Sequence, residues 1–87
     1  MCANIVEKAG IAGSGKGLAG WFNLTEASVS YDHPFHVDIE HALNIDFVNP
    51  AAGLGERVSV ELTLESARAL SVALLAALKR AEAYERS

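Results

Sequence analysis

Residues 35–48, FHVDIEHALNIDFV, alternate between apolar and polar side chains with a period of two. Such alternation predicts a β-strand with one face on a core. Fourteen extended residues would span about 46 Å, well beyond a usual strand. We therefore expect a strand over residues 41–48 and a bend or bulge between Phe35 and Glu40. The apolar register consists of Phe35, Val37, Ile39, His41, Leu43, Ile45 and Phe47.

Three further stretches have the composition of strands. Residues 3–12 contain β-branched side chains, residues 21–31 alternate toward their end, and residues 57–63 alternate throughout. Pro34 follows the second of these closely and is expected to end it. The glycine-rich residues 13–20 are predicted to form a flexible turn or hairpin loop.

The C-terminal residues 64–84 lack glycine and proline and are rich in alanine and leucine, which predicts a helix with Thr63 as its N-cap. Val72 lies on the far side of this helix from a stripe of apolar residues. We predict one α+β domain over residues 1–87, with a four-stranded, mostly antiparallel sheet (β-β-β-β-α) and the helix packed on one face. The helix stripe consists of Ala67, Leu70, Leu74, Ala77, Leu78 and Ala81, with Tyr84 at its end.

The small size of the chain favours assembly. A domain of 87 residues buries a modest share of its surface and gains from a second subunit, a metal or a disulfide. Cys2 is the single cysteine, so a disulfide within the chain is excluded. We therefore expect a homodimer.

Charge and hydropathy exclude several classes of partner. The net charge is −4 and the basic residues are scattered, which argues against nucleic-acid binding. Glu7 and Lys8 interrupt the N-terminus before a signal peptide can build, and the apolar residues 71–78 are too short to cross a bilayer. The lone cysteine suits a reducing compartment. A soluble, cytoplasmic protein without membrane contact is expected.

Two N-terminal features carry weak functional signals. GIAGSGKG, residues 10–17, matches the start of a phosphate-binding loop, but Gly17 stands where a magnesium-binding Ser or Thr is required and no helix is expected next. Cys2 could serve as a nucleophile or metal ligand if it became the N-terminus, or could be an ordinary early residue.

The three histidines are spaced H-x2-H-x4-H, as His33, His36 and His41. Imidazoles are common transition-metal ligands, so these residues are candidates for a metal site. A regular strand would put His36 and His41 on opposite faces, which argues against shared ligation unless the chain bulges. His36 shares a face with Asp38 and Glu40, in either a carboxylate–imidazole site or a solvated face.

His41 is the sharpest candidate because it lies in the apolar register. It is either a core histidine bonded to a backbone carbonyl or a general base in a small pocket. In the second case His41 or His33 moves a proton, and Asp32 or Glu40 orients the ring.

Three functions are consistent with these residues. The first is a homodimer that binds a small ligand or a protein partner through the region from Tyr31 to His41, with Tyr31, His36 and Trp21 as contacts. The second is a cofactor-free isomerase or cyclase. Its catalytic residues would be His41 or His33 as the base and Asp32 or Glu40 as the orienting group. The third is a metal-binding protein in which the histidines hold a transition metal. The first two require no cofactor.

Several segments resemble a family of short bacterial proteins known as a domain of unknown function, and the likeness covers nearly the whole chain. The resemblance implies a stand-alone, single-domain bacterial protein and supplies no activity. The segments are Gly-Ser-Gly-Lys-Gly (13–17), Gly20-Trp21-Phe22, Tyr31-Asp32-His33-Pro34, Glu40-His41-Ala42-Leu43-Asn44-Ile45-Asp46-Phe47 and Ala67-Arg68-Ala69-Leu70.

Overall fold

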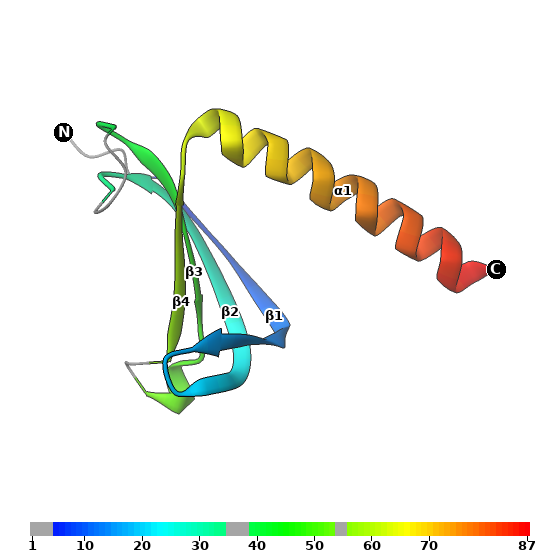
Figure 1. The fold of residues 1–87 in the computed structure, drawn as a ribbon, viewed down its shortest axis with the longest axis horizontal. Coiled ribbons are helices and arrows are strands. Elements are labelled where there is room, and N and C mark those ends of the chain that lie inside the picture. The colour runs from blue at the N-terminus through cyan, green and yellow to red at the C-terminus, as the bar shows by residue number, and fades with distance from the viewer. Residues whose placement is uncertain (1–4, 35–38, 54–55) are drawn as a thin grey trace.

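A computed structural model describes residues 5–34, 39–53 and 56–87. Four strands form one antiparallel sheet in the order β1-β2-β3-β4, and a long helix follows (Figure 1). The predicted α+β class and element order are confirmed. The elements are β1 (Ile5–Gly17), β2 (Gly20–Asp32), β3 (Ala42–Val48), a 3-10 turn (Pro50–Ala52), β4 (Arg57–Leu62) and α1 (Leu64–Arg86).

The strand register separates the sheet into an apolar face and a polar face. Ile5, Tyr31, Leu43 and Leu62 lie side by side across the four strands, and we call this row the open half of the apolar face. Further along the same face, Phe47 pairs with Val58. The predicted alternation of β3 is therefore confirmed. Residues 39 and 40 form a bend, whereas the rest of the predicted bend, residues 35–38, lies outside the described residues.

The hairpin turn predicted over residues 13–20 is present but shorter than predicted, because β1 runs through the glycines to Gly17. Gly15 and Gly17 pair with Phe22 and Gly20 across the hairpin, and the turn occupies only residues 18–19. Gly20 has a φ of 116°, a conformation that favours glycine. A strand that leads into a two-residue turn and a second strand is not a phosphate-binding loop.

The tip of this hairpin curls over the apolar face. The register shifts between Gly10 and Gly13, and such a bulge bends and twists a strand. In a flat sheet β1 and β4 would lie about 14 Å apart. Here a Cβ atom on Gly15 would lie 3.3 Å from Val58 Cγ2, and Figure 1 shows β1 turning sharply and crossing toward β4.

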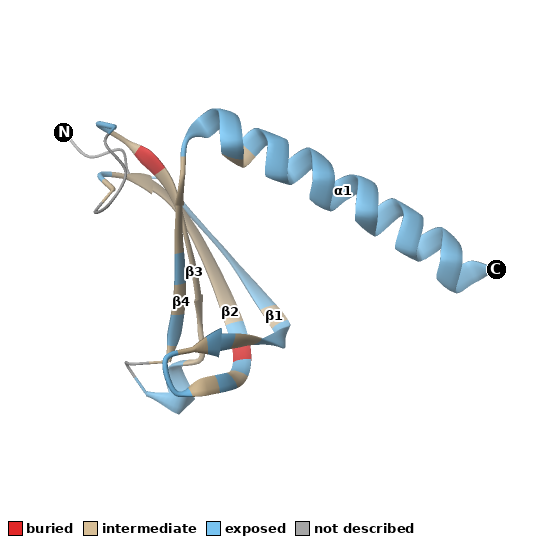
Figure 2. Ribbon diagram, in the orientation of Figure 1, coloured by how far each residue is buried: buried red, intermediate tan, exposed pale blue. Residues whose placement is uncertain are grey.

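The curled hairpin covers one half of the apolar face. Leu24 lies beneath it, 8% exposed, and together with Phe47 and Val58 it forms the covered half. Among the described residues, Leu24 and Ala42 are the only buried ones (Figure 2). The core of the single chain is therefore small.

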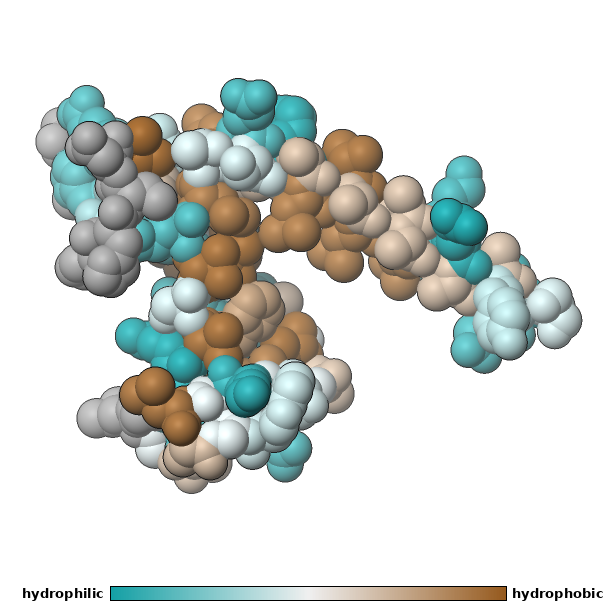
Figure 3. Space-filling model, viewed as in Figure 1, coloured by the Kyte–Doolittle hydropathy of each residue, from teal (hydrophilic) through white to brown (hydrophobic). Residues whose placement is uncertain are grey.

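The helix begins as predicted, because the Thr63 hydroxyl accepts a hydrogen bond of 3.0 Å from the backbone N–H of Ser66. Contrary to the prediction, the helix does not cover a face of the sheet. Apart from the half-buried Ala67, every residue of α1 is exposed, and Figures 2 and 3 show the helix leading away from the sheet. One residue, Thr63, separates β4 from α1, which is too short a connection for the helix to turn back along the strands.

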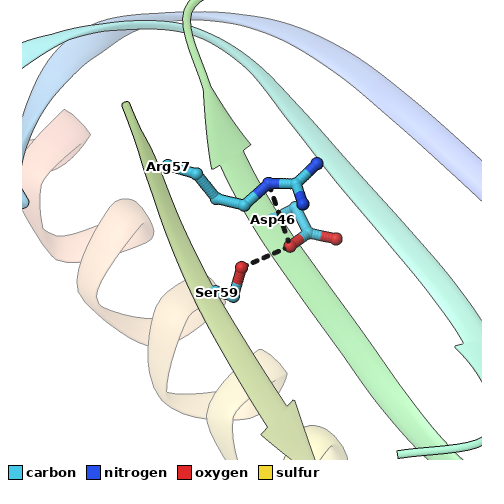
Figure 4. A network of polar contacts seen from close by, with 3 residues as sticks. All are labelled: Asp46, Arg57 and Ser59. Carbon is cyan, nitrogen blue, oxygen red and sulfur yellow. Dashed lines mark hydrogen bonds and ion pairs between the residues drawn. The ribbon is translucent and has the colours of Figure 1, made fainter. Parts of the chain in front are cut away.

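The opposite sheet face carries polar residues that pair across the strands. Ser59 Oγ donates a hydrogen bond of 2.6 Å to Asp46 Oδ1, and Arg57 Nε lies 3.8 Å from the same oxygen (Figure 4). Lys8 Nζ lies 3.8 Å from Glu26 Oε1. These contacts identify the polar face as a solvated surface of the single chain.

Within the described residues, no helix combines the length and the hydropathy needed to cross a bilayer.

Candidate functional site

Three aromatic side chains meet at one end of the sheet. Tyr31 lies near the end of β2, opposite Leu43. His33 follows β2 directly, and His41 immediately precedes β3. Because β2 and β3 are antiparallel neighbours, the end of one and the start of the other are adjacent. The topology thus brings together residues that are up to ten positions apart in the sequence.

The three rings form a stack with His41 in the middle. The centroids of the Tyr31 and His41 rings lie 5.4 Å apart with an interplanar angle of 26°. Those of His33 and His41 lie 4.8 Å apart with an angle of 24°. His33 is exposed, while Tyr31 and His41 are half-buried. We call these three residues the ring stack, and its His33 end is its most accessible part.

Hydrogen bonds with Asp32 and Glu40 hold His33 in place. Its Nδ1–H donates a hydrogen bond of 2.9 Å to the carbonyl oxygen of Glu40, and its backbone N–H donates one of 2.7 Å to Asp32 Oδ1. A carbonyl only accepts, so Nδ1 carries the proton in the neutral ring and Nε2 is left as the acceptor. Of the two predicted orienting residues, Glu40 contacts the His33 ring through its main-chain carbonyl, whereas the contact of Asp32 is with the His33 backbone.

An apolar hollow adjoins the ring stack. It has a volume of about 300 Å³ and is lined by Ile5, Tyr31, Leu43 and Leu64. Three of these residues belong to the open half of the apolar face, and Leu64 is the first residue of α1. Tyr31 thus takes part in both features, so a molecule in the hollow would contact the Tyr31 end of the ring stack, whereas His33 and His41 do not line the hollow.

Ile5, Leu43 and Leu64 were not among the predicted site residues. They come from three elements distant in the sequence, and each has an ordinary role in its own strand or helix pattern. The one available signal was that Leu43 shares the apolar register with His41. Predicting the hollow requires the strand pairing, which the local sequence does not specify.

Trp21 lies apart from the other predicted ligand contacts. It stands at the start of β2, paired with Lys16 and 71% exposed, whereas Tyr31 stands at the end of the same strand. The structure therefore does not bring Trp21 to the ring stack. His36, the third predicted contact, lies outside the described residues, as does Cys2.

The metal hypothesis stays a prediction. Among the described residues, no three His, Cys, Asp or Glu side chains form a group that could hold a metal ion. Imidazoles bind metals through lone pairs in the plane of the ring, and two roughly parallel rings do not aim these at one point. His33 and His41 as arranged are thus poorly suited to share an ion, and the role of His36 is not described.

Comparison with known proteins gives a family and no activity. No curated protein and no solved structure matches the chain. A family model described as a family of unknown function, DUF6295, matches residues 1–87. This match confirms the predicted membership in a domain of unknown function. The chain belongs to the DUF6295 family of unknown function.

Proposed function

We propose that the protein binds a small molecule that carries a flat ring and a polar substituent. The ring stack and the hollow beside it support this proposal. Binding sites for small molecules combine apolar walls with a few polar groups of fixed position. Here the hollow beside Tyr31 supplies the apolar walls, and a ligand that reaches along the ring stack meets the polar group of His33, which the Glu40 carbonyl holds at the other end.

The stack favours an aromatic ligand over an aliphatic one. Offset stacking of aromatic rings contributes about 0.5–1.5 kcal/mol beyond the burial of apolar area. His33 is exposed at the end of the stack, so a ligand ring can extend it. Nε2 of the neutral His33 accepts a hydrogen bond from a hydroxyl, and the charged imidazolium donates one to an anion.

Binding has more support than catalysis. A general base requires a reacting group within hydrogen-bond reach, in a site that excludes water. His33 is exposed, and the hollow is open to solvent on the side away from the sheet. The histidines therefore act as contacts in this proposal, and the isomerase or cyclase reaction is the weaker alternative.

The test uses phenol and benzoate as aromatic probes and cyclohexanol as the aliphatic comparison. Each is titrated into the purified chain while NMR follows the ring signals of Tyr31, His33 and His41. We expect saturable shifts for an aromatic probe with a Kd of about 1 mM, which corresponds to about −4 kcal/mol. Cyclohexanol should bind more weakly, because it cannot stack.

Two variants locate the site. His41→Gln removes the middle ring and should weaken binding at least about tenfold, a loss of about 1.4 kcal/mol. Trp21→Leu changes an exposed aromatic residue elsewhere and should leave the Kd unchanged. Thermal melting of both variants shows whether the fold is kept. The proposal is contradicted if His41→Gln binds the probes as well as the unchanged chain does. It is also contradicted if no aromatic probe binds at concentrations of about 10 mM.

A further inference from the structure

Two large apolar surfaces of this chain are uncovered. On the helix stripe, Leu70, Leu74 and Leu78 are 49%, 65% and 51% exposed. On the open half of the apolar face, Ile5 is 52% exposed, and Tyr31, Leu43 and Leu62 are half-buried. Figure 3 shows apolar side chains both on the helix and on the part of the sheet beside it. Contiguous apolar surfaces of this extent mark sites of interaction.

The total surface shows how much area a partner could cover. The chain exposes 6914 Å², whereas a compact monomer of 9.2 kDa is expected to expose about 4,900 Å². Its radius of gyration is 14.8 Å, compared with about 12 Å for a compact chain of this length. Each chain thus carries an excess of about 2,000 Å² of surface.

The chain cannot bring its two apolar surfaces together by itself. The helix stripe would have to lie on the open half of the apolar face, but Thr63 alone connects β4 to α1. A helix that returns across its own sheet normally needs a connection of about two to six residues. The two surfaces therefore remain apart within one copy and available to another.

We propose that the protein is a homodimer in which α1 of each copy lies on the open half of the partner's apolar face. Both surfaces occur once on every chain, so two copies related by a twofold axis cover both sets at once. The excess of two chains, about 4,000 Å², lies in the range of about 2,000–5,000 Å² buried by obligate homodimers. Because Ile5, Tyr31 and Leu43 also line the hollow, the partner's helix would cover the hollow in the dimer, and a ligand there would compete with that helix.

The first measurement is the mass in solution, by light scattering coupled to size exclusion. We expect twice the 9.2 kDa of the single chain over a wide range of protein concentrations. A monomer at every concentration up to about 100 µM would overturn the proposal, since an interface of this size is expected to hold well below that.

Two matched pairs of variants test the two surfaces. Leu74→Lys places a charge in the helix stripe, while Val72→Lys places one on the far side of the same helix, at a residue 61% exposed. Ile5→Lys charges the open half, while Val6→Lys charges the adjacent residue, which pairs with Ser30 on the polar face and is 53% exposed. We expect Leu74→Lys and Ile5→Lys to raise the dimer dissociation constant at least a hundredfold.

The controls should remain dimeric. If Leu74→Lys gives a monomer and Ile5→Lys does not, the dimer joins helix to helix and the proposal is wrong. If neither does, another surface joins the copies and the proposal is also wrong. Isotope-filtered NOE measurements on a mixture of labelled and unlabelled chains remain decisive if a variant fails to fold. Contacts between Leu74 methyls of one copy and Ile5 methyls of the other support the proposal, and their absence from a folded dimer overturns it.

Discussion

The two ends of the sheet's apolar face differ in how far they are covered. At the hairpin end the chain closes over itself, and Leu24 is buried against Phe47 and Val58. At the helix end, Ile5 and Leu64 stay more than half exposed although an apolar helix begins beside them. The same face is thus a core at one end and an open surface at the other.

The difference follows from what each connection allows. At the hairpin end, a bulge and several glycines let the two-stranded ribbon bend sharply, so that backbone and side chains come into contact. At the helix end, the single residue Thr63 joins two regular elements and gives no room for a reversal. The single chain therefore completes one part of its core and leaves the other part open.

The largest effect is expected at the covered half. Leu24→Ala removes the buried side chain under the hairpin and should lower the free energy of unfolding by about 2–5 kcal/mol, from lost burial plus a cavity. Chemical denaturation at one fixed protein concentration measures this change. The oligomeric mass of the folded variant should be unaltered, since Leu24 lies away from the open half.

Leu18→Ala is the matched control, because Leu18 lies in the turn of the same hairpin and is fully exposed. It should change the free energy of unfolding by less than about 0.5 kcal/mol. Equal losses for the two variants would mean that the hairpin does not close over the face as described.

A smaller loss of unfolding free energy is expected when a side chain is added at Gly15. A Cβ atom on Gly15 would lie 3.0 Å from Leu24 Cδ1 and 3.3 Å from Val58 Cγ2. Gly15→Val adds an isopropyl group there, Cβ and two methyl groups, and should cost about 1–3 kcal/mol of unfolding free energy through overpacking. The value is read from denaturant unfolding, as for Leu24→Ala.

Gly13→Val provides the comparison, because a Cβ atom on Gly13 would have nothing within 4 Å. The branched side chain should be neutral or slightly stabilising in this strand. If Gly13→Val proved as costly as Gly15→Val, the loss would come from glycine's backbone freedom and not from the close approach.

The sequence predicted the regular parts of the fold well. The period of two assigned the residues from Leu43 to Phe47 to the correct faces of β3. Thr63 and the glycine-free stretch after it located the start of α1. These features rest on local propensity and side-chain alternation, which a single sequence contains.

The parts that depend on distant contacts could not be predicted in this way. Glycine at positions 13, 15 and 17 is locally typical of a loop. At Gly15 only the proximity of Leu24 and Val58, which come from other strands, explains why glycine is needed in a strand. The amphipathic pattern of the helix indicated that its apolar stripe packs on a sheet face. Periodicity alone does not specify which surface that is. Likewise, the sequence indicated Tyr31, His33 and His41 as neighbours, while the role of the Glu40 carbonyl depends on the path of the chain.

The smallest effect is expected on the polar face. Arg57 and Asp46 form an ion pair with a separation of 3.8 Å, and the arginine side chain is 60% exposed. Such pairs contribute about 0–1 kcal/mol, so Arg57→Gln should lower the free energy of unfolding by less than about 0.5 kcal/mol. Ser59→Ala, which deletes the 2.6 Å hydrogen bond to the same carboxylate, should cost more, about 0.5–1.5 kcal/mol.

Salt separates the two contributions, because about 1 M salt shortens the screening length to about 3 Å and removes most of an exposed charge interaction. The Arg57→Gln difference should then disappear in denaturant unfolding, while the Ser59→Ala difference should persist. A loss above about 1 kcal/mol for Arg57→Gln at high salt would contradict this assignment. It would mean that the polar face also holds the strands together, and that the two sheet faces differ less than their side chains indicate.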